Sequence, residues 1–168
     1  MPKQCILING TMGVGKTTVC KKLASILPRS VFLDGDWCWY SNPLIVTEDS
    51  KKMVLQNIGF LLRSFLNCPD YQTVIFCWVM DRQEILDQII ELISPACQNT
   101  EIRCFTLTVS EPVLLTRLQK DVDLQLRQPD ILSRSVARLG LYHSLNTEKI
   151  NTDRLSPQQT AQKIIERL

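Results

Sequence analysis

Four residues with fixed spacing carry the clearest chemistry of the chain, in the pattern Gly10-x-x-x-x-Gly15-Lys16-Thr17. Glycines at these two positions permit backbone angles and a close approach that a Cβ atom would block. Backbone N–H groups in such a loop bind anions, and the start of a following helix adds roughly half a positive charge. Lys16 is expected to reach the β- and γ-phosphates of a nucleotide, and the Thr17 hydroxyl to ligate Mg²⁺. The spacing therefore predicts a phosphate-binding loop.

The residues on both sides of the loop predict the elements that hold it. The run 5–8 is apolar throughout, which is typical of a buried parallel strand. The segment 17–27 has apolar residues at helical spacing, and Pro28 ends it. A strand, a loop and a helix in this order place the loop at the helix N-terminus. We expect the nucleotide to contact Gly10, Thr11, Met12, Gly13, Val14, Gly15, Lys16, Thr17 and Thr18.

Two carboxylates, Asp34 and Asp36, follow the second apolar run of the chain. Parallel sheets bind ligands at the carboxyl ends of their strands, so this pair is expected near the phosphate-binding loop. Two carboxylates one residue apart can divide the work of phosphoryl transfer: one holds Mg²⁺ through its water, and the other accepts a proton from an attacking hydroxyl. The alternative is an Asx-type turn with two solvated aspartates.

Strand and helix signals alternate along the chain, which predicts an α/β fold with a parallel sheet covered on both faces. Strands are expected at 5–8, 31–34, 73–79, 102–109 and 149–152. Helices are expected at 17–27, about 48–66, behind a capping box at 81–84, from Ser110, from Pro129 to near Tyr142, and from Ser156. The stretch 121–128 is polar and is expected to form a loop. No linker or repeat divides residues 1–168, which are expected to form one domain.

These features together resemble the small-molecule P-loop kinases: shikimate kinase, gluconate kinase, adenylylsulfate kinase and chloramphenicol phosphotransferase, with the nucleoside monophosphate kinases as broader relatives. The resemblance rests on GTMGVGKT at 10–17, Asp34-Gly35-Asp36, the arginine-bearing segment 117–138 and the closing INTDRLSPQQTAQKI. It implies ATP and Mg²⁺ as cofactors, a three-layer α/β/α fold with strand order 2-3-1-4-5, and a short lid at about 120–135. It also implies that Asp34 serves Mg²⁺ and that Asp36 is both a substrate ligand and the catalytic base.

Arginines suit the stabilisation of charge on a moving phosphoryl group because their planar forks bind oxyanions. Arg127, Arg134 and Arg138 lie in or just after the segment that resembles the lid, and we expect Arg127 and Arg134 to act catalytically with Lys16. Arg117 resembles the family arginine that packs against adenine. The alternative for each is an exposed helix or loop residue.

Two further groups are candidates for the acceptor site. Trp37, with Trp39 and Tyr40, follows the aspartates and either walls a pocket or belongs to the core. Arg63 either pairs with an anion of the substrate or is a surface residue.

The only acidic residue close after the third strand is Asp81, which is either a helix N-cap, the favoured interpretation, or a Walker B carboxylate that serves Mg²⁺. His143, the only histidine, is expected to be structural or exposed.

Composition excludes several classes of protein. The chain has 168 residues and a net charge of +2, with no basic tail, so nucleic acid is not expected as the main ligand. No apolar stretch reaches ~18 residues, and the start leaves no room for a signal peptide, so no membrane role is expected. Seven cysteines without paired spacing predict reduced thiols and a cytoplasmic location.

The sequence therefore predicts an ATP-dependent phosphotransferase that acts on a hydroxyl group of a small-molecule acceptor. One alternative is a nucleoside monophosphate kinase, in which Arg63 and Arg82 would bind the acceptor phosphate. The other is a non-catalytic nucleotide-binding module. Neither the acceptor nor the oligomeric state can be predicted from the sequence.

Overall fold

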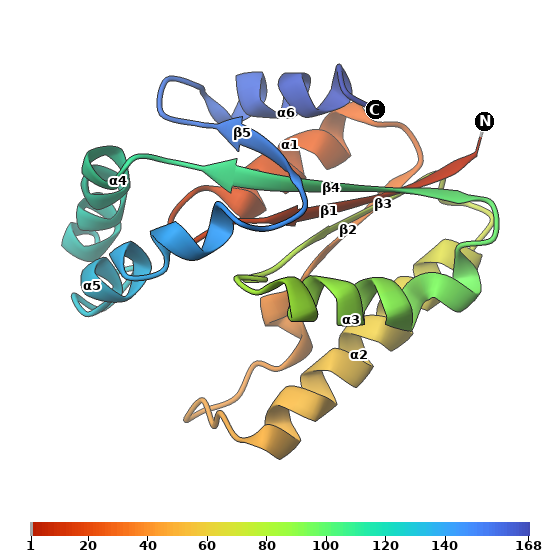
Figure 1. Ribbon diagram of the computed structural model, residues 1–168, viewed down its shortest axis with the longest axis horizontal. Helices are drawn as coiled ribbons and strands as arrows, with labels where there is room; N and C mark the ends of the chain where they lie inside the picture. The colour runs from red at the N-terminus through yellow and green to blue at the C-terminus, as the bar shows by residue number, and fades with distance from the viewer. Residues whose placement is uncertain (1) are drawn as a thin grey trace.

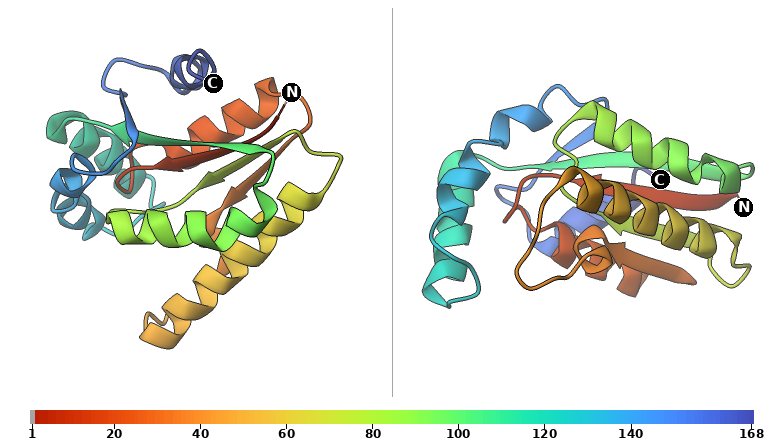
Figure 2. Two further views of the ribbon diagram at one scale, coloured as in Figure 1. Left: turned by 45° about the vertical axis from the view of Figure 1, so that its right-hand side comes forward. Right: turned by 90° about the horizontal axis from the view of Figure 1, so that it is seen from below.

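The computed structural model describes residues 2–168, which form a five-stranded parallel sheet between helices (Figures 1 and 2). The strands are β1 (Lys3–Asn9), β2 (Ser30–Asp34), β3 (Thr73–Cys77), β4 (Thr100–Thr108) and β5 (Glu148–Asn151). The α-helices are α1 (Lys16–Ile26), α2 (Glu48–Asn67), α3 (Gln83–Ile93), α4 (Glu111–Asp123), α5 (Ile131–Val136) and α6 (Pro157–Ile165). The strand order is β2-β3-β1-β4-β5, so the predicted three-layer fold and its order are confirmed.

Alternation along the buried strands builds two cores, one on each face of the sheet. In β1, Ile6 and Ile8 pack with α1 and α6, whereas Cys5 and Leu7 pack with α2 and α3. Figure 1 shows the same division, with α1 and α6 above the sheet and α2 and α3 below it. Because both faces are covered, the central strands β1 and β3 carry continuous apolar runs, which is the pattern that predicted them, whereas the outer strands β4 and β5 include charged residues.

The strand register brings the ends of β1, β2 and β3 to one edge of the sheet. Ile8 of β1 and Asp34 of β2 both pair with Cys77 of β3. The loop after β1 and the aspartates after β2 therefore meet at this edge, as parallel topology requires. Helices α4 and α5 lie beyond the same edge (Figure 1).

Local signals at helix starts are confirmed in two places. Ser156 and Gln159 form a reciprocal capping box at the start of α6, and Pro112 lies in the first turn of α4. All seven cysteines are free, and Cys5, Cys77 and Cys104 lie in strands as expected. No helix within residues 2–168 combines the length and apolar character needed to cross a membrane.

The largest differences from the predicted boundaries are at β3, at α4 and in the helix expected from Pro129. Strand β3 ends at Cys77, two residues early, and α4 continues to Asp123, so the expected loop at 121–128 begins as helix. The helix expected from Pro129 to near Tyr142 is interrupted. It comprises α5 of six residues and a separate 3₁₀ turn at Leu139–Tyr142. The apolar spacing that predicted one helix is real, because Leu132, Val136 and Leu139 all pack on the core, but the backbone between them changes its hydrogen-bond pattern.

Candidate phosphate-binding and acceptor site

The loop between β1 and α1 lies so close to its neighbours that two of its glycines are required. A Cβ atom on Gly10 would lie 2.6 Å from the carbonyl oxygen of Leu107, and one on Gly13 would lie 2.4 Å from Leu118 Cδ2. Both glycines also have positive φ angles, 142° and 84°. The loop is therefore pressed against β4 and α4, which fixes its shape.

Gly15 differs from Gly10 and Gly13, because a Cβ atom at this position would point into a cavity rather than against a neighbour. Its φ is 105°, and a Cβ atom there would meet nothing within 4 Å. The cavity has a volume of about 270 Å³ and is lined by residues of the loop, including Gly13, Lys16 and Thr18. Backbone N–H groups at a helix N-terminus beside an open space form the kind of site that fits a phosphate.

Replacing Gly15 by alanine is expected to lower the melting temperature by several degrees. The left-handed backbone costs an L-residue about 1–2 kcal/mol, and the new methyl group would also occupy the cavity. Thermal unfolding and nucleotide titration measure the two effects. Gly140→Ala is the matched control, because position 140 has equal space and no positive φ. Equal melting temperatures and nucleotide affinities for the two variants would contradict this assignment.

Lys16 holds the loop together from inside. Its Nζ donates to the carbonyl oxygens of Gly10, at 2.8 Å, and Thr11, at 3.1 Å. Loss of hydration among surrounding protein atoms lowers the pKa of this amine, while the charges of Asp36 and Asp34 act in the opposite direction. The ammonium group therefore lies between the loop and the two aspartates.

A hydroxyl and a carboxylate meet beside Lys16. The Thr17 hydroxyl donates to Asp34 Oδ2 at 2.6 Å, and Asp34 Oδ1 accepts from the Asp36 N–H at 3.1 Å. Such hard oxygen donors suit Mg²⁺. Within residues 2–168 no three His, Cys, Asp or Glu side chains gather as a metal site. One or two protein oxygens with phosphate oxygens are a usual arrangement for Mg²⁺, so this pair fits that cation.

Asp36 lies in the 3₁₀ turn Gly35–Cys38 and lines two cavities at once. Reduced hydration and the negative charge of Asp34 raise the pKa of the Asp36 carboxyl, although Lys16, Trp78 and Arg127 oppose the shift. A carboxylate with a raised pKa accepts a proton more readily than an ordinary one. The position and electrostatics of Asp36 therefore suit a general base.

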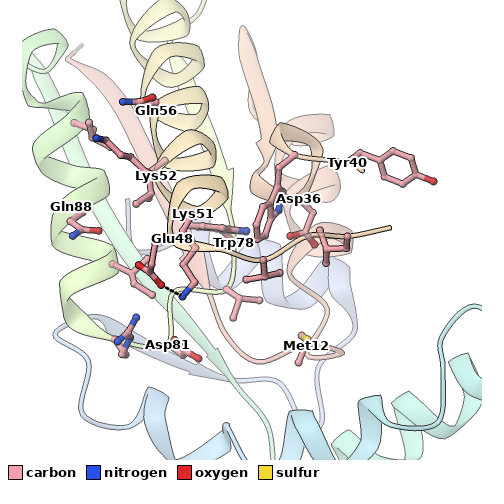
Figure 3. Close-up of a pocket in the computed structure, with 18 of the residues that line it drawn as sticks. Met12, Asp36, Tyr40, Glu48, Lys51, Lys52, Gln56, Trp78, Asp81 and Gln88 are labelled. Carbon is pink, nitrogen blue, oxygen red and sulfur yellow. Dashed lines mark hydrogen bonds and ion pairs between the residues drawn. The ribbon is translucent and has the colours of Figure 1, made fainter. Parts of the chain in front are cut away.

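The second cavity is much larger, about 1630 Å³, and extends from the phosphate pocket into the space between α2 and α3 (Figure 3). In that view Asp36 and Met12 lie on one side, and Gln56 and Gln88 lie between the two helices. The two cavities share five lining residues, which are Met12, Asp36, Trp78, Val79 and Arg127. The candidate site thus has two compartments that join at Asp36.

The predicted arginines have different positions. Arg127 lines both cavities and pairs with Asp121 at 3.1 Å, whereas Arg134 lines only the larger cavity and pairs with Asp130 at 3.0 Å. Arg117 lines the smaller cavity, where it donates to the Val14 carbonyl and to Thr152. Arg117 therefore connects the loop to the end of β5.

The capping role favoured for Asp81 is wrong. The N-cap position of α3 is Arg82, and no side chain caps the helix there. The Asp81 carboxylate instead forms an ion pair with Arg138, which joins the segment after β3 to the segment after α5. Asp81 lines the larger cavity and is absent from the lining of the smaller one.

Removing Arg138 is expected to destabilise the fold. The Asp81 side chain is only 11% exposed, so Arg138→Ala leaves a nearly buried carboxylate without its partner, at a cost of about 1–3 kcal/mol. Arg134→Ala is the matched control because its ion pair is exposed, and it should change stability by less than about 0.5 kcal/mol. Denaturant unfolding compares the two, and a smaller loss for Arg138→Ala would contradict the assignment.

The aromatic candidates separate into two groups. Trp37 is 56% exposed, packs edge-on against Phe32 at 5.2 Å between ring centroids, and lines neither cavity. Trp39 lines the larger cavity and packs edge-on against Trp78, with ring centroids 6.3 Å apart. Sequence reasoning missed Trp78 as a site residue. The feature that could have identified Trp78 is its position directly after β3, at the ligand-binding edge of the sheet.

Two other candidates do not line the smaller cavity. Arg63 lines the larger cavity, where its Nη1 donates to the Leu92 carbonyl oxygen at 2.7 Å. His143 is exposed and lines neither cavity.

The fold and the loop define a P-loop domain of the nucleotide-kinase type. A family model described as an AAA domain matches residues 6–131, and the chain belongs to that family. No curated protein sequence matches the chain significantly.

Solved structures share the fold at low sequence identity. A tunicamycin resistance protein from Deinococcus radiodurans is 20% identical, with a TM-score of 0.72 over 98% of this chain and 95% of that one. A gluconokinase from Sinorhizobium meliloti is 19% identical, with a TM-score of 0.67 over 99% and 93%. A shikimate kinase from Acinetobacter baumannii, solved with shikimate, is 21% identical, with a TM-score of 0.65 over 99% and 93%.

Proposed function

We propose that the protein is an ATP- and Mg²⁺-dependent phosphotransferase that moves the γ-phosphoryl group to a hydroxyl of a small molecule. The observation that carries the proposal is the position of Asp36, at the junction between a phosphate-sized pocket and a separate larger cavity. A base at such a junction faces donor and acceptor together. The names of the gluconokinase and shikimate kinase of similar fold support this class of reaction.

Four side chains of the smaller pocket, together with the backbone of the loop, have distinct tasks in this proposal. Magnesium-bound ATP supplies the phosphoryl group. The loop N–H groups and Lys16 bind the phosphates, and the oxygen atoms of Thr17 and Asp34 would hold Mg²⁺. Asp36 orients the acceptor hydroxyl and takes its proton. The bond from the acceptor oxygen to the γ-phosphorus forms while the bond to the β–γ bridging oxygen breaks.

The segment at about 120–135 serves as the lid in this proposal. Arg127 lines both compartments, so it is placed to meet charge on the moving phosphoryl group. Its ion pair with Asp121 is partly exposed and that of Arg134 with Asp130 is largely exposed, so exchanging them for phosphate oxygens costs little. Closure of this segment would also exclude water from the reaction. Arg117, which lines the smaller cavity, is proposed to contact the adenine of ATP.

One observation favours the alternative of a nucleoside monophosphate kinase. The larger cavity is lined by seven lysines and arginines against four aspartates and glutamates, an excess that suits an anionic acceptor. Such a reaction needs no strong base, because the acceptor is a phosphate. Asp36 would then have no proton to take.

The direct test measures transfer of labelled γ-phosphate from ATP to a panel of small alcohols, hydroxy acids, nucleosides and nucleoside monophosphates. The proposal expects an alcohol to accept phosphate and the same alcohol to raise the melting temperature. Transfer to nucleoside monophosphates alone would establish the alternative. Tight ATP binding without transfer to any acceptor would instead indicate a non-catalytic module.

A further inference from the structure

The larger cavity is long as well as wide. Its α2 wall runs from Glu48 to Arg63, a span of about 22 Å at the rise of an α-helix. The opposite wall runs along α3 from Arg82 to Pro95. Its volume of about 1630 Å³ exceeds the roughly 300–1,000 Å³ of ordinary small-molecule pockets. A six-carbon hydroxy acid would leave most of this space unfilled.

The far end of the cavity is closed by contact between the two helices. A Cβ atom on Gly59 would lie 3.2 Å from Leu92 Cβ, so α2 and α3 touch there. Arg63 fastens the same end by its hydrogen bond to the Leu92 carbonyl. The amino-terminal half of α2 then diverges from α3 (Figure 2, left). The cavity is therefore a wedge that narrows away from Asp36.

The wedge has a mainly apolar lining between its two ends. Leu55 of α2 and Ile85 of α3 line it, together with the paired rings of Trp39 and Trp78. Its rim carries apolar side chains that remain exposed, such as Leu44 at 59% and Val46 at 55%. Exposed apolar groups gathered on one groove mark a binding surface for an apolar ligand.

Among the described residues, two cations of the wedge form no ion pair within hydrogen-bonding distance. Five of its seven lysines and arginines bind carboxylates or carbonyl oxygens of the protein. Within residues 2–168, the side chains of Lys52 and Arg82 form no ion pair or hydrogen bond, although the charge of Arg82 is near enough to help lower the pKa of the Glu48 carboxyl, whose main partner is Lys51. Lys52 lies on the second turn of α2 and lines the same cavity as Asp36. An anionic group on the ligand would complement these charges.

We propose that the acceptor is an elongated anionic amphiphile. Its hydroxyl lies at Asp36, its apolar segment lies between Leu55, Ile85 and the two tryptophans, and its anionic group reaches Lys52 and Arg82. This inference rests on the proposed function for its phosphoryl-transfer step, and on the wedge alone for the class of ligand. Compact sugar acids satisfy the hydroxyl and the charge but not the apolar length.

The test uses ω-hydroxy acids, which carry a hydroxyl and a carboxylate at opposite ends of an alkyl chain. Binding of 4-hydroxybutanoate, 8-hydroxyoctanoate and 12-hydroxydodecanoate is measured by calorimetry with a non-hydrolysable ATP analogue present. Affinity is expected to rise at least about tenfold from the shortest to the longest, because each fully buried CH₂ contributes up to about fourfold. The methyl ester of the longest acid should bind at least about fivefold more weakly than the acid.

Lys52→Gln is the diagnostic variant, and Lys21→Gln, on the exposed side of α1, is its matched control. The first should reduce the preference for the acid over its ester, while the second retains it. Melting temperatures of both variants confirm that they are folded. Affinity that does not depend on chain length, or an unchanged preference in Lys52→Gln, would overturn the inference.

The outcomes also separate this inference from the proposed function. Efficient phosphorylation of gluconate or shikimate, with no binding of the longer acids, would overturn the amphiphile and leave the kinase in place. Length-dependent binding without transfer to any alcohol would overturn the kinase and support the ligand class.

Discussion

Asp36→Asn is expected to reduce kcat for phosphoryl transfer to an alcohol by about 10²- to 10⁴-fold, because an amide cannot take the proton of the acceptor hydroxyl. Binding of ATP with Mg²⁺ should change little, since Lys16, Thr17 and Asp34 remain. Steady-state transfer rates and nucleotide titration separate the two effects. Asp70→Asn, at an exposed position, is the control and should retain full activity. A loss below about threefold in Asp36→Asn would instead favour an acceptor that is itself a phosphate.

The same residue sets the acid side of the pH profile. The raised pKa of Asp36 means that the base becomes protonated at a higher pH than an ordinary aspartate. Activity is therefore expected to fall with decreasing pH through a value above 3.8, the usual pKa of this side chain.

The pH dependence of folding stability has the opposite sign to the pH dependence of activity. The folded state binds this proton more tightly than the unfolded state, so stability falls as pH rises through the raised pKa. The neutral amide avoids that cost, and Asp36→Asn should unfold at the same temperature as the parent or higher.

Lys16→Met is expected to reduce kcat/KM for ATP by about 10²- to 10³-fold, the usual effect of removing one donor to developing charge. The amine is held against the Gly10 and Thr11 carbonyl oxygens, within the loop that would receive the phosphates. No other lysine lines the smaller pocket within the described residues. Transfer rates and calorimetric titration with ATP and Mg²⁺ measure the loss.

The control for this variant is Lys21→Met, on the exposed side of α1. Loss of hydration lowers the pKa of Lys16, so its charge is costly in the folded state. Its two hydrogen bonds to carbonyl oxygens favour the folded state and its loss of hydration opposes it, so the net contribution is small and Lys16→Met should unfold close to the temperature of the parent. Unimpaired ATP binding and transfer in this variant would contradict the phosphate-binding role of the loop.

Most of the fold could be predicted because its signals are local. An apolar run of five to seven residues predicts a strand buried on both faces, and the caps of α6 lie within four residues of each other. The loop at 10–17 is a contiguous motif as well. Since the carboxyl ends of parallel strands share one edge, the approach of Asp34 to Thr17 followed from the order of the elements alone.

The larger cavity could not be predicted, because distant segments form it. The ion pair of Asp81 with Arg138 joins residues 57 positions apart, and no local pattern distinguishes such an aspartate from an N-cap. Which of Trp37 and Trp39 lines the larger cavity depends on the short 3₁₀ turn Gly35–Cys38. Three residues per turn place position 39 on the same side as Asp36 and leave Trp37 on another. The role of Trp78 depended on Gly35, where a Cβ atom would lie 2.5 Å from its ring.

The absence of a side chain at position 59 has a consequence for how such a protein diversifies. Helices α2 and α3 meet closely because Gly59 is small, and a Cβ atom there would lie 3.2 Å from both Arg63 Nη1 and Leu92 Cβ, which is tighter than an ordinary contact. A bulky residue there would push the two helices apart and widen the larger cavity, starting from its narrow end. A substitution at this one position, far from the reacting atoms, would therefore change the width of the acceptor cavity and leave the residues of the phosphate pocket as they are.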